Sequence, residues 1–282
     1  MAVADLCTPE GVALLWSWLQ NERVLAVFLA PPCGSASRAR QIPLKRKRFG
    51  HPERGRHGPR PLRDDEHPNG FPNLSDSDNR RVSLANQLYF LTAQIVEWAV
   101  ENGVIVCVEN PQFSFFWTTT FWQQVAHLLQ YSVFHSCQYG SARQKKTMLA
   151  FNVNEFHAIN ATCRGQNSKH KHAQWGFNRK TKSFATAEET AYPMGLAKMI
   201  AMVIVRSLLN LGIRGNPETL EAVQPVALQA LQKMRAATGT QSRSSRIPAL
   251  VPTYKLRFRI GGASNSLPDV NIFCQYFSKI TK

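Results

Sequence analysis

Two side chains capable of chemistry each follow an apolar run that predicts a buried strand. Cys33 comes after residues 24–30 and two prolines, and Glu109 follows residues 104–108 directly, ahead of Asn110. A short segment that is apolar on both faces is typical of a parallel strand covered by helices. Because ligands of such sheets bind beyond the carboxyl ends of the strands, neighbouring strands would bring this thiol and this carboxyl group together. The thiol is then a candidate nucleophile, and the carboxyl group a candidate acid or base.

Each residue taken alone favours a simpler role. A single cysteine is usually a small buried hydrophobic residue, and a glutamate after a strand is usually a solvated turn residue. The segment after Cys33 makes the pair more specific, because residues 34–80 are rich in Arg, Lys, His, Pro and Gly. This composition predicts a long, basic, mobile loop beside the two residues and outside the core.

The composition favours a polyanionic partner. The 282 residues carry a formal net charge of +16, and 44% of them are apolar, enough for a substantial core. The simplest polyanion is nucleic acid, although a basic tail on an otherwise neutral domain would give the same total. The predicted phosphate contacts are the cationic residues of the basic loop, up to Arg63, and chiefly Arg38, Arg40, Lys45, Arg46, Lys47 and Arg48.

Compartment signals favour an intracellular and nuclear protein. The run Lys45–Arg48 fits a nuclear import signal, and an equally good interpretation is a phosphate-binding or solvated loop. Six scattered cysteines without a C-x-x-C pair predict a reducing compartment. The N-terminus does not resemble a signal peptide. The apolar stretch 194–211 contains Lys198 and Arg206, so we expect a packed helix and no membrane span.

Helical and strand patterns alternate along residues 1–212. Helices are predicted at 8–20, from about 83 to 103, at 121–129 and from 193 to 210, and two further strands at 132–138 and 147–153. This alternation predicts one α/β domain with a mostly parallel sheet and flanking helices. Residues 213–282 predict a helix at 217–237, a linker and a poorly structured tail.

Several short motifs together resemble those of cytosine-C5 DNA methyltransferases. Pro31-Pro32-Cys33-Gly-Ser-Ala-Ser37 resembles that family's Pro-Cys loop, and Glu109-Asn110-Pro111 is similar to its Glu-Asn-Val motif. Residues 138–147 resemble the later motif that ends in Gln-x-Arg-x-Arg, and residues 185–201 look like the final helical motif. Asp5-Leu6 resembles the acidic position that faces the cofactor. The motifs keep the family's order over roughly residues 3–210.

The resemblance implies methyl transfer from S-adenosylmethionine to C5 of cytosine in DNA. Cys33 would add to C6 of a flipped-out base, and Glu109 would hold and protonate N3. Asn110 would fix the loop and the base. The cations Arg38, Arg40 and Arg143 would favour the thiolate.

The same resemblance assigns the remaining site residues and a Rossmann-like methyltransferase fold. Asp5, Pro31 and Tyr192 would contact the cofactor, Lys145 would contact nucleic acid, and residues 155–183 would form a small target-recognition region. Trp175 in that region is a candidate for stacking on a base, although packing is the simpler role.

The chain also departs from the family. The family's first strand and Phe-x-Gly-x-Gly loop, which wrap the methyl donor, have no counterpart, so we expect a partial fold that lacks the first cofactor-binding strands. Thr147 stands where the last arginine of its motif would be. The alternative function is therefore a catalytically inactive, methyltransferase-derived nucleic-acid-binding module, and RNA is an alternative substrate. Truncated units of this kind resemble modules attached to retroelement polyproteins.

A histidine-rich segment offers ligands of the type that zinc prefers. Cys163, His170 and His172 would need one more ligand, either His157 or Cys137. The spacing is not a standard zinc pattern, and a solvated polar loop explains the segment more simply. The sequence therefore predicts no metal site, with Cys163, His170 and His172 as secondary candidates.

Overall fold

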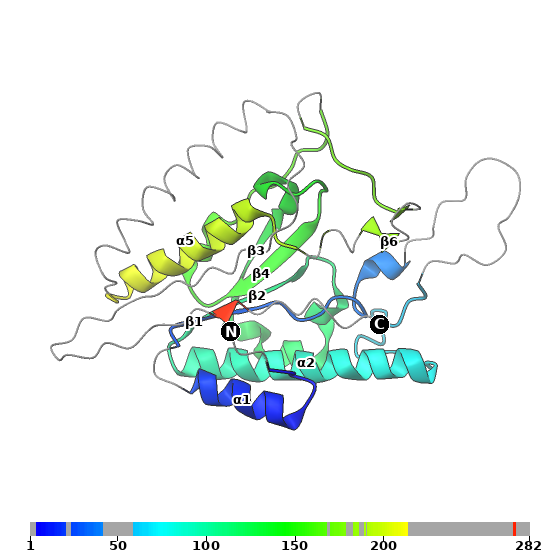
Figure 1. Cartoon of the computed structure of the whole chain (residues 1–282), viewed down its shortest axis with the longest axis horizontal. Helices are drawn as coiled ribbons and strands as arrows, with labels where there is room; N and C mark the ends of the chain where they lie inside the picture. Colours follow the sequence, from blue (N-terminus) through cyan, green and yellow to red (C-terminus); the bar gives the residue numbers. More distant parts are fainter. Residues whose placement is uncertain are drawn as a thin grey trace, which may run out of the picture.

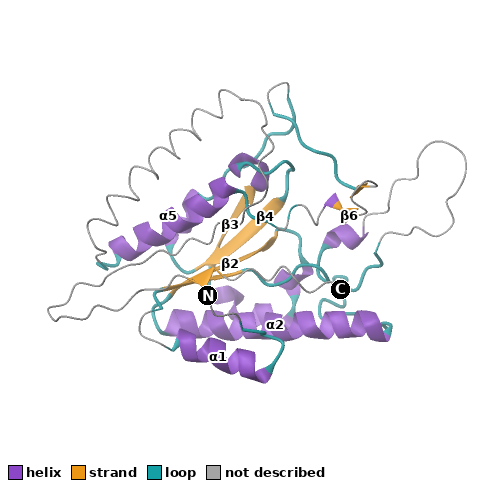
Figure 2. Ribbon diagram, in the orientation of Figure 1, coloured by secondary structure: helices purple, strands orange, loops and turns teal. Residues whose placement is uncertain are grey.

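The fold is a mixed β-sheet covered by helices on both faces (Figures 1 and 2). This computed structural model describes residues 4–20, 24–41, 59–167, 170–178, 183–185, 189, 191–213 and 273–274. Within these residues the predicted α/β class is confirmed. The predicted helix at 217–237 lies outside them, as do Lys45, Arg46, Lys47 and Arg48.

The sheet is mixed, which corrects the prediction of a mostly parallel one. Its strand order is β3 (Gln130–His135), β4 (Lys146–Phe151), β2 (Ile105–Pro111), β1 (Ala26–Leu29) and the two-residue β7 (Phe273–Cys274). β1 pairs in parallel with β2 and β7, whereas β4 runs antiparallel to both β2 and β3. Residues 136–145 join β3 to β4, and so short a connection cannot make the crossover that a parallel pair requires.

Both faces of β1 and β2 are buried, and the two faces pack against different helices. On one face Val27, Leu29, Val106 and Val108 pack with α1 (Pro9–Leu19), α2 (Asp76–Glu101) and α3 (Thr120–Val125). On the other, Ala26, Phe28, Ile105 and Cys107 pack with α5 (Met194–Asn210). In Figure 1 the sheet lies between α5 on one side and α1 and α2 on the other. The paired stretches 26–29 and 105–108 are apolar throughout because both faces are covered.

Local signals explain where the helices begin. Thr8 caps α1 by accepting the Gly11 N–H, and Pro9 and Glu10 occupy its first turn. Ser75 caps α2, which therefore begins at Asp76, well before the position predicted from its apolar stripe. Short elements complete the described chain: η1 (Arg38–Gln41), η2 (Phe115–Thr118), η3 (Ala126–Leu128), η4 (Ser136–Tyr139), η5 (Asn154–Ala158), β5 (Phe177–Asn178) and β6 (Ser183–Phe184).

The basic loop predicted at 34–80 is partly core. Leu62 and Arg63 are each only 1% exposed, and α2 already begins within the range. The prediction that the whole segment lies outside the core is therefore wrong for its described part. Residues 42–58 lie outside the described ranges.

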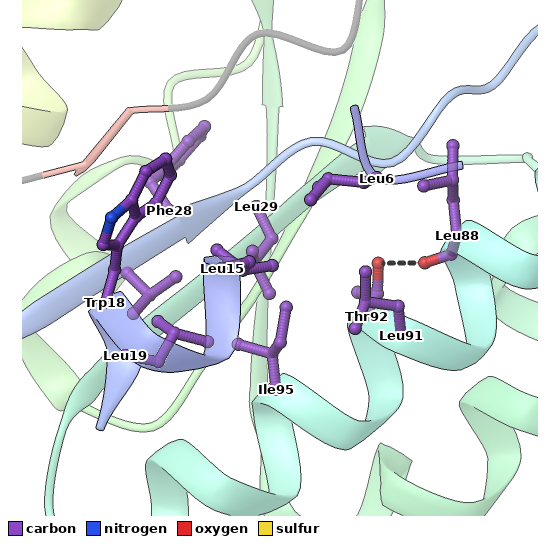
Figure 3. A pocket seen from close by; sticks show the side chains of 11 residues that line it. Leu6, Leu15, Trp18, Leu19, Phe28, Leu29, Leu88, Leu91, Thr92 and Ile95 are labelled. Carbon is purple, nitrogen blue, oxygen red and sulfur yellow. Dashed lines mark hydrogen bonds between the residues drawn. The ribbon is translucent and has the colours of Figure 1, made fainter. Parts of the chain in front are cut away.

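An apolar pocket lies between α1, α2 and β1 (Figure 3). Leu15, Leu29 and Leu88 are among its lining side chains, none of which is charged, and the Thr92 hydroxyl already donates to the Leu88 carbonyl oxygen at 2.7 Å. The predicted catalytic residues do not line it, so its character is that of core packing. Among the described residues no helix is both long and apolar enough to cross a bilayer.

Gly195 lets α5 lie against η4, and replacing it tests this packing. A Cβ at Gly195 would stand 2.6 Å from the Tyr139 carbonyl oxygen. We expect Gly195→Ala to lower the free energy of unfolding by about 1–2 kcal/mol, since overpacking outweighs the gain in helix propensity. The measurement is denaturant unfolding. Gly34→Ala is the control, because its Cβ would meet nothing within 4 Å, and its stability should change by less than about 1 kcal/mol. Equal stabilities would contradict the close approach.

Candidate functional site

The parallel pairing of β1 and β2 brings the segments of Cys33 and Glu109 to one edge of the sheet. Leu29, the last residue of β1, is the partner of Val108, so the chain leaves β1 beside the point where β2 continues into Glu109. Directly beyond that pair, the Asn110 side-chain amide donates to the Pro31 carbonyl oxygen at 2.8 Å. The two motifs picked out by sequence are therefore physically tied together.

Glu109 is buried, and its two oxygens have different surroundings. Oε2 accepts a hydrogen bond from the Tyr192 hydroxyl at 2.7 Å. Oε1 lies 3.6 Å from Lys145 Nζ, an ion-pair distance, and has no hydrogen-bond partner within the described structure. A buried acceptor left in this condition costs about 1–3 kcal/mol. Oε1 is thus the atom that a hydrogen-bond donor on a ligand would satisfy.

A small pocket opens at this carboxyl group. Its polar lining comes from four parts of the fold: β2, η4, β4 with the loop before it, and the segment leading into α5. The lining residues are Glu109, Ser136, Lys145, Thr147, Glu189 and Tyr192, with Phe134, Ala191, Pro193 and Leu196. A second buried acceptor without a hydrogen-bond partner in the described residues, Asn110 Oδ1, belongs to the same strand end.

The loop that carries Cys33 is held at several points. The Tyr89 hydroxyl donates to the Pro32 carbonyl oxygen at 2.6 Å, and burial raises the pKa of Tyr89 to about 12, which keeps this donor protonated. Past the cysteine, the Ala36 N–H donates to the Cys33 carbonyl oxygen at 3.0 Å, and the Phe115 N–H donates to the Ala36 carbonyl oxygen at 2.8 Å. The loop is therefore fixed to α2 and η2.

Arg63 supports this loop from inside the core. Its guanidinium donates to Ser35 Oγ at 3.1 Å and to Asn86 Oδ1 and the Pro68 carbonyl oxygen, and it lies over the Tyr89 ring. Burial lowers the pKa of Arg63. The sequence analysis placed this residue at the end of a phosphate-binding loop, which its burial contradicts.

Burial also controls the ionisation of Cys33. It raises the pKa of the thiol; Lys145 opposes this rise and Glu109 adds to it. The predicted activating cations Arg38 and Arg40 are engaged elsewhere. Arg38 pairs with Asp65 and lies over the Phe115 ring, and Arg40 donates to backbone carbonyl oxygens. The cation that favours the thiolate is therefore Lys145, which the sequence analysis assigned to nucleic acid.

Arg143, the third predicted cation, binds two other segments of the chain. It pairs with Glu189 at 3.1 Å, and its Nε donates to the Gln174 carbonyl oxygen at 3.1 Å. Its guanidinium carbon lies 5.8 Å from the centre of the Trp175 ring, which is 49% exposed. Arg143 thus connects the β3–β4 loop to the segment that carries this exposed aromatic.

The three predicted cofactor contacts do not converge. Asp5 is exposed, and its Oδ1 accepts the Cys7 N–H in its own turn. The Pro31 carbonyl oxygen is taken by Asn110, and the Tyr192 hydroxyl donates to Glu109. The two described pockets do not bring these residues together. These three residues therefore have partners apart from one another among the described residues, and S-adenosylmethionine stays a prediction from the sequence.

No role was predicted from the sequence for Tyr89 or Phe113, and Arg63 was predicted to contact phosphate. Phe113 is 56% exposed, just past the Glu-Asn-Pro motif, and its ring lies 5.7 Å from Lys146 Nζ. The three aromatics that follow it, Phe115, Phe116 and Trp117, are buried, so the sequence pattern alone does not single out Phe113. The partners of Tyr89 and Arg63 are largely backbone atoms from distant segments, for which no sequence pattern exists.

The zinc candidates gather into one cluster, whose fourth member is Cys137. The ligand atoms of Cys137, Cys163, His170 and His172 all lie within 4.8 Å of one another. The other candidate for the fourth position, His157, is elsewhere, with its Nε2 at 2.8 Å from Gln130 Oε1.

Comparison with known proteins identified no relative. No model of a protein family matches the chain. Curated proteins and solved structures likewise contain no match.

The ionisation of Cys33 should respond to its two charged neighbours in opposite directions. Because the pKa of Cys33 is raised, its rate of alkylation by iodoacetamide should keep rising at pH values where the rate of an ordinary thiol has already levelled off. Lys145→Met should move this profile to higher pH and Glu109→Gln to lower pH. The measurement is mass spectrometry of the peptide that carries Cys33. Cys7, whose shift comes from burial and Asp5, is the internal control and should not respond to either change. A Cys33 profile unchanged by both variants would contradict the arrangement.

Removal of the Tyr89 hydroxyl tests how the loop is held. Tyr89→Phe leaves the Pro32 carbonyl oxygen without its partner, so we expect a loss of about 1–2 kcal/mol in the free energy of unfolding. Cys33 should also become more reactive toward iodoacetamide, as its loop opens to solvent. Tyr131→Phe, which removes an exposed hydroxyl, is the control and should have a smaller effect on stability and none on Cys33. An inert Tyr89→Phe would rule out this anchor.

Proposed function

We propose that this protein acts on cytosine in DNA, with Cys33 adding to C6 of the base and Glu109 holding its N3 and N4 edge. The overall reaction of which this is the base-activating part is methyl transfer from S-adenosylmethionine to C5. The observation that carries the proposal is Glu109 Oε1. It is a buried acceptor without a hydrogen-bond partner in the described structure, beside the cation that also acts on Cys33.

A carboxyl group is complementary to the edge of cytosine. The base offers an acceptor at N3 and donor hydrogens at N4, and a protonated carboxyl group offers one donor and one acceptor. Tyr192 fixes one oxygen of Glu109 and leaves the other open. Asn110 Oδ1 is a second buried acceptor at the same strand end. Uracil presents a donor at N3, so it would fit the same protonation state poorly.

The addition of Cys33 to the base needs only the side chains of Cys33 and Glu109 and the solvent. Cys33 loses its thiol proton to solvent, and the thiolate sulfur forms a bond to C6. The C5–C6 π electrons form a C4–C5 double bond, and the C4–N3 π electrons move to N3, which takes the proton of Glu109. The product is a neutral enamine whose C5 is nucleophilic, and Glu109 is left as a carboxylate paired with Lys145. Without an electrophile to react at C5, the addition reverses and Cys33 is released.

Access to C6 requires a base outside the duplex. Enzymes that react with a base flip it into a pocket, and they read it by its pairing edge and by stacking. Phe113 and Trp175 are exposed aromatics carried by the segments after β2 and beside Arg143. The net charge of +16 supplies non-specific attraction to phosphates. These features support a nucleic-acid partner.

Two observations favour a second function, a nucleic-acid-binding module without activity. Asp5, Pro31 and Tyr192 do not meet in a donor site, and burial disfavours the Cys33 thiolate. Such a module would bind DNA and a flipped base, but it would not form the sulfur–carbon bond.

An adduct assay separates the two functions. A DNA duplex with 2-pyrimidinone in place of one cytosine is a suitable probe, because the missing amino group makes C6 more electrophilic and no methyl donor is needed. We expect the full chain to form a one-to-one adduct, detected by intact mass. Cys33→Ser should abolish it, and Glu109→Gln should slow it about 100-fold, since an amide cannot protonate N3. Cys7→Ser is the matched cysteine control and should react normally.

Each other outcome decides the question differently. DNA retention in a gel without any adduct would leave the binding module. An adduct that survives Cys33→Ser would remove the nucleophile assignment. A faster adduct with the same base in single-stranded RNA would assign RNA as the substrate.

A further inference from the structure

Two cysteines and two histidines form a compact group outside the Cys33–Glu109 site. Cys137 lies in η4, Cys163 follows η5, and His170 and His172 come from the next described segment. All four ligand atoms lie within 4.8 Å of one another. Both sulfurs belong to buried residues, whereas the histidines are partly exposed. The proposal drawn from this group does not rest on the proposed activity.

Within the group, nitrogen and sulfur atoms that can each bind a metal ion lie close to one another. His172 Nε2 lies 2.9 Å from His170 Nε2 and 3.5 Å from Cys163 Sγ. The two imidazole rings are perpendicular, with centroids 4.6 Å apart. A neutral imidazole has one protonated and one bare nitrogen, so facing nitrogens need either a shared proton or a cation between them.

Hydrogen bonds to the backbone hold two of the four ligands, Cys163 and His170. His135 Nδ1 accepts the Cys163 N–H at 2.8 Å, and Gln144 Nε2 donates to the Cys163 carbonyl oxygen at 3.3 Å. Asn167 and His170 exchange two hydrogen bonds, which fixes the approach of the first histidine. The spacing His-x-His places both rings on the same side of an extended segment. Cys163 and His170 are therefore ordered by contacts other than those with the other ligands.

We propose that Cys137, Cys163, His170 and His172 bind one Zn²⁺ ion in a closed tetrahedral site. Two thiolates and two imidazoles are a ligand set that zinc takes in structural sites, and four protein ligands leave no position for a substrate. The two cysteines are free thiols, so no disulfide competes for them. Cys137 belongs to a different part of the chain from the other three, which explains why sequence spacing did not reveal the site.

The site would fasten the segment after Cys163 to η4 and the β3–β4 loop. The same two segments already meet where the Ala173 N–H donates to the Ala142 carbonyl oxygen at 2.8 Å and where Arg143 binds the Gln174 carbonyl oxygen. Next to Cys137, the Ser136 N–H donates to the Lys145 carbonyl oxygen, and both residues line the Glu109 pocket. Zinc would thus order the wall of that pocket and the segment that presents Trp175.

Metal analysis of the full chain tests the proposal. After exposure to Zn²⁺ and removal of free metal, elemental analysis should find about one zinc per chain. Cys163→Ser and His172→Ala should each lower the retained zinc at least tenfold. Cys7→Ser and His157→Ala are the matched controls outside the cluster and should retain the full amount. Equal retention by all four variants, or no zinc in the parent chain, would overturn the site.

Cobalt provides a readout that does not depend on the variants' stability. The parent chain loaded with Co²⁺ should show the intense visible bands of a tetrahedral ion and the near-ultraviolet charge transfer of thiolate ligands. Zn²⁺ should bleach both. A weak spectrum typical of six-coordinate Co²⁺ would overturn the tetrahedral Cys₂His₂ assignment even if the variants fail to fold.

Discussion

The parallel register of β1 and β2 is the constraint on which the rest of the site depends. Ala26 to Leu29 pair one-to-one with Ile105 to Val108, and successive residues alternate between the two helical layers. A slip of one residue would move every side chain of a strand to the opposite face, where it would meet the other layer of helices. The register therefore fixes where both strands end, and with it the relation between the Cys33 loop and Glu109. The Asn110–Pro31 hydrogen bond closes this relation.

That edge gathers two acids and one cation in a buried space. Glu109 raises the pKa of Cys33 and Lys145 lowers it, and Lys145 also lies at ion-pair distance from Glu109. A buried site with a single cation favours one negative charge at a time. In the proposed reaction, addition of the thiolate to a base would remove the charge from sulfur, and proton transfer to the base would place a charge on Glu109. The pair with Lys145 is thus suited to the state after addition, and burial of the thiol disfavours the state before it.

Much of the fold could be predicted from local sequence, and the pairing between distant segments could not. Apolar runs indicated β1 and β2, because strands covered on both faces need no polar alternation. Nothing in β4 itself shows that it inserts between β2 and β3, yet this insertion places Thr147 opposite Pro111 and so brings Lys145 to Glu109. Arg63 was misassigned for a related reason. Its basic surroundings predict solvent, whereas its partners are carbonyl oxygens, a hydroxyl and an amide brought together by the tertiary fold.

The segment from η4 to β4 connects the Glu109 pocket with the cluster of cysteines and histidines. Cys137 faces the cluster of cysteines and histidines, and its neighbour Ser136 lines the Glu109 pocket. A few residues later Arg143 holds Gln174 and Glu189, and Lys145 faces Glu109. Tyr139 and Cys137 are buried, but most of the other residues of this connection are polar, so hydrophobic burial holds only part of it. Cross-links from polar and ionisable side chains supply the order that the pocket needs, and their placement at this connection positions Lys145 without enlarging the core.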